Sequence, residues 1–225
     1  MSFLSAITEK PWLPQTTPSV SNSEIVQYKL QRQTALKFFL GVVAVIFFLF
    51  SVTFLSRTQF PDFMALSGEP WQPFTKPVQL IYNSFALLFS SAALQWTKHS
   101  INNNQLNKTL AGIILASFFS LLFLFGQVLV WQQLVNLGYK LTSNPANSYF
   151  YLFTTVHGLH ILGGLVALTT VTIQFIRKSS LEKLSTGIQL CTTYWHFLFV
   201  VWVLLFALLT SSPETYKTIA QLCGF

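Results

Sequence analysis

Hydrophobic residues in this chain gather into five long runs that short polar stretches separate. The runs cover residues 38–56, 78–96, 109–135, 149–176 and 188–209, and basic or turn-forming residues bound each of them. A hydrocarbon core of about 30 Å needs roughly 20 helical residues, so each run is long enough to cross a bilayer. All nine prolines lie outside the runs, which favours unbroken helices. The pattern predicts an all-α fold, a polytopic membrane bundle of five transmembrane helices.

The same pattern divides the chain into three parts. A polar N-terminal segment covers residues 1–35, the five-helix membrane domain covers 36–211, and a short tail covers 212–225. Only 8% of the residues are charged, whereas about a quarter are charged in an ordinary soluble domain. The net charge of +7 comes from basic residues spread along the loops, so we expect a lipid environment and no nucleic-acid partner.

The basic residues also predict the orientation. Nine of them fall on one side of the five predicted spans and four on the other. The larger group is Lys10, Lys29, Arg32, Lys37, Lys98, Lys108, Arg177, Lys178 and Lys183, and the smaller group is Arg57, Lys76, Lys140 and Lys217. The positive-inside rule therefore predicts a cytoplasmic N-terminus and a C-terminus outside.

No acidic residue lies within any of the five runs. The six acids are Glu9, Glu24, Asp62, Glu69, Glu182 and Glu214. A proton pump or ion-coupled transporter normally needs an ionisable carboxylate at membrane depth. The sequence therefore argues against a transporter formed by this chain alone.

Two histidines, His157 and His160, lie near the middle of the fourth run. Their spacing of three places them on one helix face, and two residues are fewer than the three protein ligands of usual zinc sites. A bis-histidine haem would need a partner at equal depth. His160 is expected about 24 Å along its helix from the cytoplasmic end, and His196 only about 12 Å into its own. We therefore expect no catalytic, cofactor-binding or metal-binding residue here, and hydrogen bonds to neighbouring helices, a lipid headgroup or a partner subunit instead.

The second run carries small and polar side chains that are typical of a helix-packing face. Asn83, Ser90 and Ser91 lie there beside two alanines, and hydroxyls on such a face can bond across a helix interface. Gly158, Gly163 and Gly164 give the fourth run a similar small-residue face. We expect the faces around Ser90–Ala93 and Gly158–Gly164 to contact other helices.

Four motifs in chain order resemble subunit III of the haem–copper oxidases. The stretch from Tyr151 to Leu165 resembles the family's aromatic and His-x-x-His signature followed by glycine. Tyr194-Trp195-His196-Phe197 with a downstream Trp202 resembles its last-helix motif. The remaining similarities are Asn83 with Ser90-Ser91, and Gln127 followed by Trp131, Leu134 and Gly138. They cover roughly residues 36–210 and resemble the bacterial-type five-helix form of the family, which lacks the first two of seven helices.

The chain departs from the family pattern at three positions. Aligned by eye, Val43, Val130 and Phe199 stand where relatives often carry a buried carboxylate. No role attributed to those carboxylates is therefore expected here. The lipid-filled cleft of seven-helix members also uses the two missing helices.

The resemblance implies a non-catalytic subunit III of a terminal oxidase that reduces oxygen and pumps protons. It would lie in a bacterial cytoplasmic membrane, pack on subunit I with subunit II nearby, and hold phospholipids. Haems and copper would belong to the partner subunits. Three alternatives stay open: an accessory subunit of a nitric oxide reductase, a small permease, and a cytochrome b with histidine pairs matched in depth.

Overall fold

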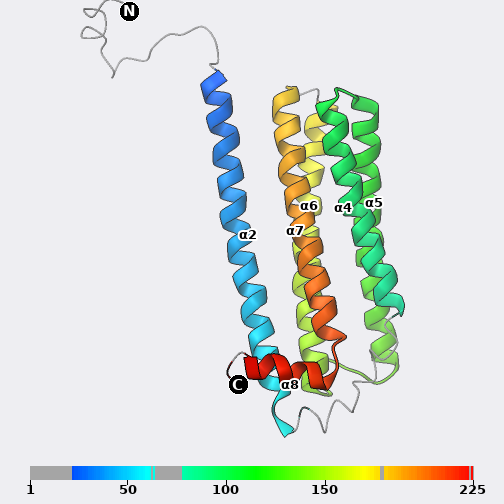
Figure 1. Ribbon diagram of the computed structural model, residues 1–225. Coiled ribbons are helices and arrows are strands. Elements are labelled where there is room, and N and C mark those ends of the chain that lie inside the picture. The colour runs from blue at the N-terminus through cyan, green and yellow to red at the C-terminus, as the bar shows by residue number, and fades with distance from the viewer. Residues whose placement is uncertain (1–21, 62, 64–77, 178–179, 223, 225) are drawn as a thin grey trace, which may run out of the picture.

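The computed structural model describes residues 22–61, 63, 78–177, 180–222 and 224, and it confirms the all-α prediction. Its helices are α2 (Asn22–Thr58), α4 (Val78–Asn102), α5 (Leu106–Asn136), α6 (Pro145–Ile176), α7 (Leu181–Leu209) and α8 (Pro213–Leu222). Helices α4 to α7 stand side by side, α2 runs along one flank, and α8 lies across one end (Figure 1). We call that end the α8 end and the opposite end, where a short turn joins α4 to α5, the turn end.

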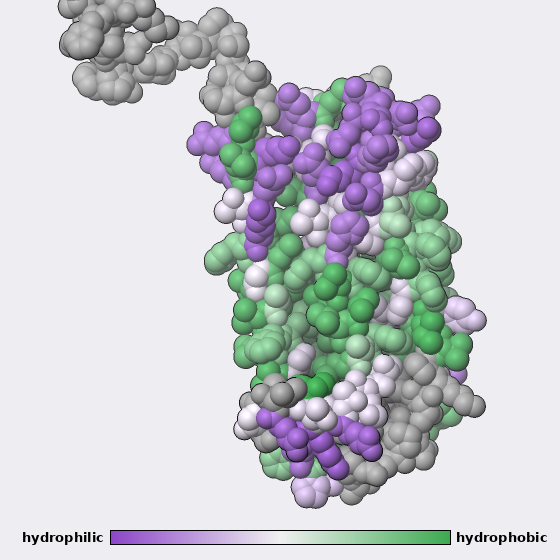
Figure 2. All heavy atoms as spheres, in the orientation of Figure 1, coloured by the Kyte–Doolittle hydropathy of each residue, from purple (hydrophilic) through white to green (hydrophobic). Residues whose placement is uncertain are grey.

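Four of these helices are long and apolar enough to cross a membrane. They are α2, counted from Val26, and α5, α6 and α7. The run predicted at 78–96 is helical, as α4, but it does not belong to this apolar group. Its polar residues, among them Asn83, Ser90, Ser91 and Gln95, lower its hydropathy. A belt of hydrophobic side chains separates polar ends on the face shown in Figure 2.

The helices extend beyond the predicted apolar runs because local capping, and not hydropathy, sets their ends. At the start of α6 the side chain of Asn144 accepts a hydrogen bond from the backbone N–H of Asn147 (2.7 Å), and Pro145 follows as the first helical residue. Helix α5 ends at a turn where Gly138 has a positive φ of 90° and the N–H of Tyr139 bonds to Leu134 O (2.9 Å).

The N-terminal part of α2 lies within the segment 1–35 that the sequence marked as polar. Helix α2 begins at Asn22, and no proline or glycine occurs from there to Lys37, so nothing interrupts the helix before the apolar run. Residues 1–21 of that segment lie outside the described residues. At about 1.5 Å per residue the 37-residue helix is roughly 55 Å long, well beyond a hydrocarbon core.

Helix α8 was not predicted within the tail 212–225, and its buried face packs on α2. Tyr216 and Ala220 are buried while Glu214 and Lys217 are exposed, so the helix is amphipathic. The Tyr216 ring meets the fully buried Phe54 edge-to-face, with centroids 5.5 Å apart. This contact ties the C-terminal part of α2 to the remainder of the bundle.

We expect Tyr216→Phe to lower the stability of the purified chain by about 1 kcal/mol. The Tyr216 hydroxyl donates to Leu208 O in the last turn of α7 (2.8 Å), and the variant leaves that carbonyl without its partner. Thermal unfolding in detergent measures the change. Thr218→Val removes an exposed hydroxyl from the same helix and should change stability by less than about 0.5 kcal/mol. Equal stability of the wild type and Tyr216→Phe would contradict the assignment.

Candidate functional site: polar contacts inside the helix bundle

Ser90 begins a hydrogen-bond chain that joins three helices. Its hydroxyl donates to Ala116 O of α5 (2.9 Å) and lies 2.7 Å from the Ser120 hydroxyl. Ser120 in turn accepts from the indole N–H of Trp195 on α7 (3.0 Å). All of these side chains are buried, and Trp195 is fully so. The predicted packing face around Ser90 therefore lies between α4, α5 and α7.

Two glycines of α5 let it approach α4 closely. A Cβ at Gly112 would overlap the side chain of Thr97, and a Cβ at Gly126 would overlap the side chain of Asn83. Such close backbone approach is the usual role of small residues in membrane helix pairs. Asn83 thus lies against the α5 backbone at Gly126, the residue that precedes Gln127.

His196 bonds to the same helix that carries the serine pair. Its Nδ1 lies within hydrogen-bond distance of the Ser91 hydroxyl, and its Nε2 is 3.2 Å from Gln95 Oε1. A neutral imidazole fits both contacts when the Ser91 hydroxyl donates to Nδ1 and the Nε2–H group donates to Gln95. The two bonds satisfy both ring nitrogens between α7 and α4.

His157 is fully buried among aromatic rings. Its ring centroid lies 5.2 Å from that of Trp202, 5.8 Å from that of Phe123 and 6.3 Å from that of Phe47. Within the described part of the chain neither of its ring nitrogens has a hydrogen-bond partner. The expected hydrogen bonds from His157 to neighbouring helices are therefore not formed between described side chains.

His160 makes local contacts instead. Its Nδ1 lies 2.7 Å from Val156 O one turn earlier, and its ring lies 5.6 Å from that of Phe47 on α2. The carbonyl of His160 accepts a hydrogen bond from the Tyr194 hydroxyl of α7 (2.9 Å). Through its carbonyl His160 thus links α6 to α7.

The predicted difference in depth between His160 and His196 is too large. Gly164 of α6 packs against Tyr194 and Trp195 of α7, so His160 and His196 differ in depth by only about 5 Å at 1.5 Å per residue. The estimate failed because α7 begins at Leu181, well before the apolar run. The two histidine side chains point to different helices. His196 bonds to α4, while His160 lies beside Phe47 of α2.

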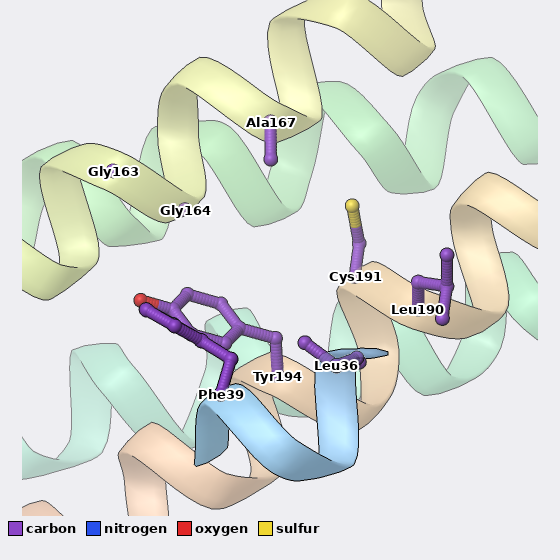
Figure 3. Close-up of a pocket in the computed structure, with 8 residues that line it drawn as sticks. All are labelled: Leu36, Phe39, Gly163, Gly164, Ala167, Leu190, Cys191 and Tyr194. Carbon is purple, nitrogen blue, oxygen red and sulfur yellow. The ribbon is translucent and has the colours of Figure 1, made fainter. Parts of the chain in front are cut away.

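Gly163 and Gly164 have opposite surroundings. A Cβ at Gly164 would lie 2.8–2.9 Å from ring carbons of Tyr194 and Trp195, so this glycine is a tight helix contact. At Gly163 nothing lies within 4 Å of that position, so the expected helix contact is wrong for this glycine. Gly163 opens onto an apolar groove of about 280 Å³ between α2, α6 and α7 (Figure 3). The groove is lined by Leu36, Phe39, Gly163, Gly164, Ala167, Leu190, Cys191 and Tyr194.

Two of the three apolar positions at which the sequence was expected to depart from the family pattern lie in the core of the structure. Val43 of α2 and Val130 of α5 are buried, and Phe199 of α7 is half-buried. Among the described residues no group of three or more His, Cys, Asp or Glu side chains could hold a metal ion.

The sequence reasoning missed several polar residues of the interior. Ser120 receives the Trp195 bond, Ser84 accepts from the Trp202 indole (2.8 Å), and Thr154 accepts from the Trp131 indole (3.1 Å). Ser120 could have been found, because it lies at helical spacing from Gly112, Ala116 and Gln127 on one buried stripe.

Comparison with known proteins assigns this helix bundle to a family. The sequence profile of the family described as cytochrome c oxidase subunit III matches residues 19–211, which is most of the chain. The chain belongs to the cytochrome c oxidase subunit III family. Its membership and its long apolar helices make it a multi-helix membrane protein, and membership in an oxidase subunit family implies association with other oxidase subunits.

Three relatives illustrate the range of this subunit III family. The cytochrome c oxidase subunit 3 of Thermostichus vulcanus is 28% identical over 174 residues, which are 75% of this chain and 85% of that protein. The protein of that name from Chondrus crispus is 27% identical over 139 residues, 61% of this chain and 47% of its own length. The cytochrome bo(3) ubiquinol oxidase subunit 3 of Buchnera aphidicola is 30% identical over 129 residues, 57% of this chain and 66% of its own. The match thus spans only about half of the Chondrus crispus protein.

Proposed function

We propose that this chain is a non-catalytic subunit III of a haem–copper terminal oxidase in a bacterial cytoplasmic membrane. It packs on subunit I, with subunit II as a further partner, and supports assembly, lipid binding and sustained turnover. Haems and copper belong to those partner subunits. The family match over residues 19–211 carries this proposal, together with relatives named as cytochrome c and ubiquinol oxidase subunits.

The use of polar side chains inside the bundle supports a packing role. Ser90, Ser91, Ser120 and His196 bond between helices, and Trp195 bonds to Ser120. The described histidines do not gather around one point, since His99 bonds only to Asn103 and His196 faces α4. Such contacts position helices against one another.

We further propose five transmembrane spans with the N-terminus in the cytoplasm and the C-terminus outside. Helix α4 packs between α5 and α7 along their length, with contacts from Asn83 near the α8 end to Thr97 near the turn end. A helix held in this way shares the depth of its neighbours, which supports a span in spite of its lower hydropathy. Among the described residues, most of the basic side chains that predict the orientation lie towards the turn end.

The groove beside Gly163 supports phospholipid binding. Its lining is almost wholly apolar, and it opens between α2 and the helices α6 and α7. An acyl chain is the occupant that the bilayer supplies to such a surface.

Two of the three alternatives, the nitric oxide reductase subunit and the permease, are less well supported. A nitric oxide reductase accessory subunit would share this fold, but the three relatives described above are named as oxidase subunits. A gene for a copper-site subunit II beside this gene would exclude it. A permease would favour broken helices, whereas α4 to α7 are each continuous.

Sustained turnover is the property that tests the proposed function. We expect a terminal oxidase prepared without this chain to start at a rate close to that of the intact complex and then lose activity sooner. Oxygen consumption followed over many turnovers measures both, and the visible spectrum of each preparation provides the control for haem content. Immediate loss of the haem bands on removal of the chain would contradict the proposal.

We expect His157→Phe combined with His160→Phe to weaken assembly with the oxidase while leaving its haem spectrum unchanged. Both rings lie beside Phe47, so the pair helps to hold α2 on α6. The yield of complex that copurifies with the tagged chain measures assembly. His99→Phe, at an exposed position, is the matched control. Loss of a haem band from the purified chain itself would show that the histidines bind a cofactor.

A further inference from the structure

Three buried side chains of the bundle carry polar atoms that have no hydrogen-bond partner in the described structure. The atoms are Nδ2 of Asn83, both amide atoms of Gln127 and both ring nitrogens of His157. Asn83 is 6% exposed, Gln127 3% and His157 not at all. A buried polar group left without a partner costs about 1–3 kcal/mol, so three such residues in one bundle need a physical explanation.

These side chains lie at one level of the bundle, on three different helices. On α5 the indole of Trp131 bonds to Thr154 of α6, and Leu124 lies next to Gly158. Gln127 falls between positions 124 and 131, so it lies level with the stretch 154–158 that contains His157. Asn83 lies against α5 at Gly126, the residue before Gln127.

Helix α7 completes the arrangement through Trp202. Its ring lies 5.2 Å from that of His157, and its indole N–H donates to Ser84, the neighbour of Asn83 (2.8 Å). We call Asn83, Ser84, Gln127, His157 and Trp202 the polar layer.

The unpartnered atoms determine which hydrogen-bond donors and acceptors a ligand must offer. The two amide nitrogens donate, Gln127 Oε1 accepts, and a neutral imidazole offers one donor and one acceptor. No charged side chain belongs to the polar layer, which disfavours an ion, and an apolar gas such as dioxygen cannot use these groups. Water both donates and accepts, and buried waters typically make about three hydrogen bonds to otherwise unsatisfied groups.

We propose that the polar layer binds water inside the membrane bundle, held between Gln127, His157 and Asn83. The bound water supplies the hydrogen bonds that the helices do not supply to one another. It joins α4, α5 and α6 at a level where α7 already joins α4 through Trp202 and Ser84. This inference does not depend on which proteins assemble with the chain.

Solid-state NMR on the full chain in lipid bilayers, together with its copurifying partners, tests the site. Histidine is labelled with ¹⁵N, and magnetisation is transferred from water protons to the ring nitrogens. The His157 signal is the one that disappears in His157→Phe, or in His157→Gln if the first variant does not fold. We expect transfer from water to His157 in the wild type. Exposed His99 is the internal positive control.

The Gln127→Leu variant tests whether the transfer to His157 comes from water bound in the polar layer. It removes both unpartnered amide atoms of that residue, so the transfer to His157 should be lost while that to His99 stays. Gln132→Leu, at an exposed position on the same helix, should change neither. Absence of transfer to His157 in the wild type, with His99 signal present, overturns the proposal even if Gln127→Leu does not fold. Transfer to His157 that survives unchanged in a folded Gln127→Leu variant also overturns it.

Discussion

Gly164→Leu is expected to prevent the chain from folding, while Gly163→Leu leaves it folded. Even a Cβ at Gly164 would lie less than 3 Å from the rings of Tyr194 and Trp195. Trp195 is fully buried and bonded to Ser120, and Tyr194 is bonded to His160 O, so neither ring can move without losing a contact. Overpacking of this kind costs about 3 kcal/mol or more for a whole leucine side chain.

The neighbouring glycine provides the matched control. The substitution is the same and lies on the same helix, but at Gly163 the new side chain enters the apolar groove. The amount of monodisperse chain recovered from membranes and its thermal midpoint measure the two effects. Similar recovery of both variants would contradict the helix contact between α6 and α7 described here.

Phe54→Ala is expected to destabilise the chain by about 3–5 kcal/mol, the usual cost of removing a buried phenylalanine. Phe54 is fully buried, and its ring packs edge-to-face on Tyr149, Phe153 and Tyr216 with centroids 5.4–6.0 Å apart. Those rings belong to α6 and α8, so the variant should also release α2 from the bundle.

Limited proteolysis and thermal unfolding check this prediction together. We expect Phe54→Ala to expose α2 to protease at temperatures where the wild type resists. Phe48→Ala on the same helix removes a ring that is 66% exposed, and it should behave like the wild type in detergent. Equal resistance of Phe54→Ala and Phe48→Ala would show that the aromatic cluster does not hold α2.

The apolar runs were enough to predict the five long helices but not their ends. Asn144 and Pro145 set the start of α6. Helix α7 begins at Leu181, before the apolar run at 188–209, so His196 lies deeper along its helix than the run predicted. Capping and turns are local features that hydropathy does not describe. Helix α8 was not predicted because its amphipathic pattern, with Tyr216 buried and Lys217 exposed, extends over only about three turns.

The sequence indicated which side chains of the candidate site lie at helix contacts, but it did not indicate which residues of other helices they contact. Ser90 and Gly164 lie at helix contacts as expected, since small residues at helical spacing indicate close packing. The bond from Ser91 to His196 and the aromatic surroundings of His157 depend on which helices become neighbours. A single sequence with short loops does not determine that arrangement. Gly163 has open space at its Cβ position while the adjacent Gly164 is in tight contact, because helix rotation separates adjacent residues by about 100°.

Copurification from native membranes tests the central claim most directly. The tagged chain is extracted in mild detergent, the accompanying proteins are identified by mass spectrometry, and a visible spectrum is recorded. The proposed function predicts a haem–copper subunit I and a subunit II in the eluate, with haem bands that disappear when the chain is separated from them. An eluate without subunit I, or haem bands that remain with the separated chain, would contradict a non-catalytic subunit III.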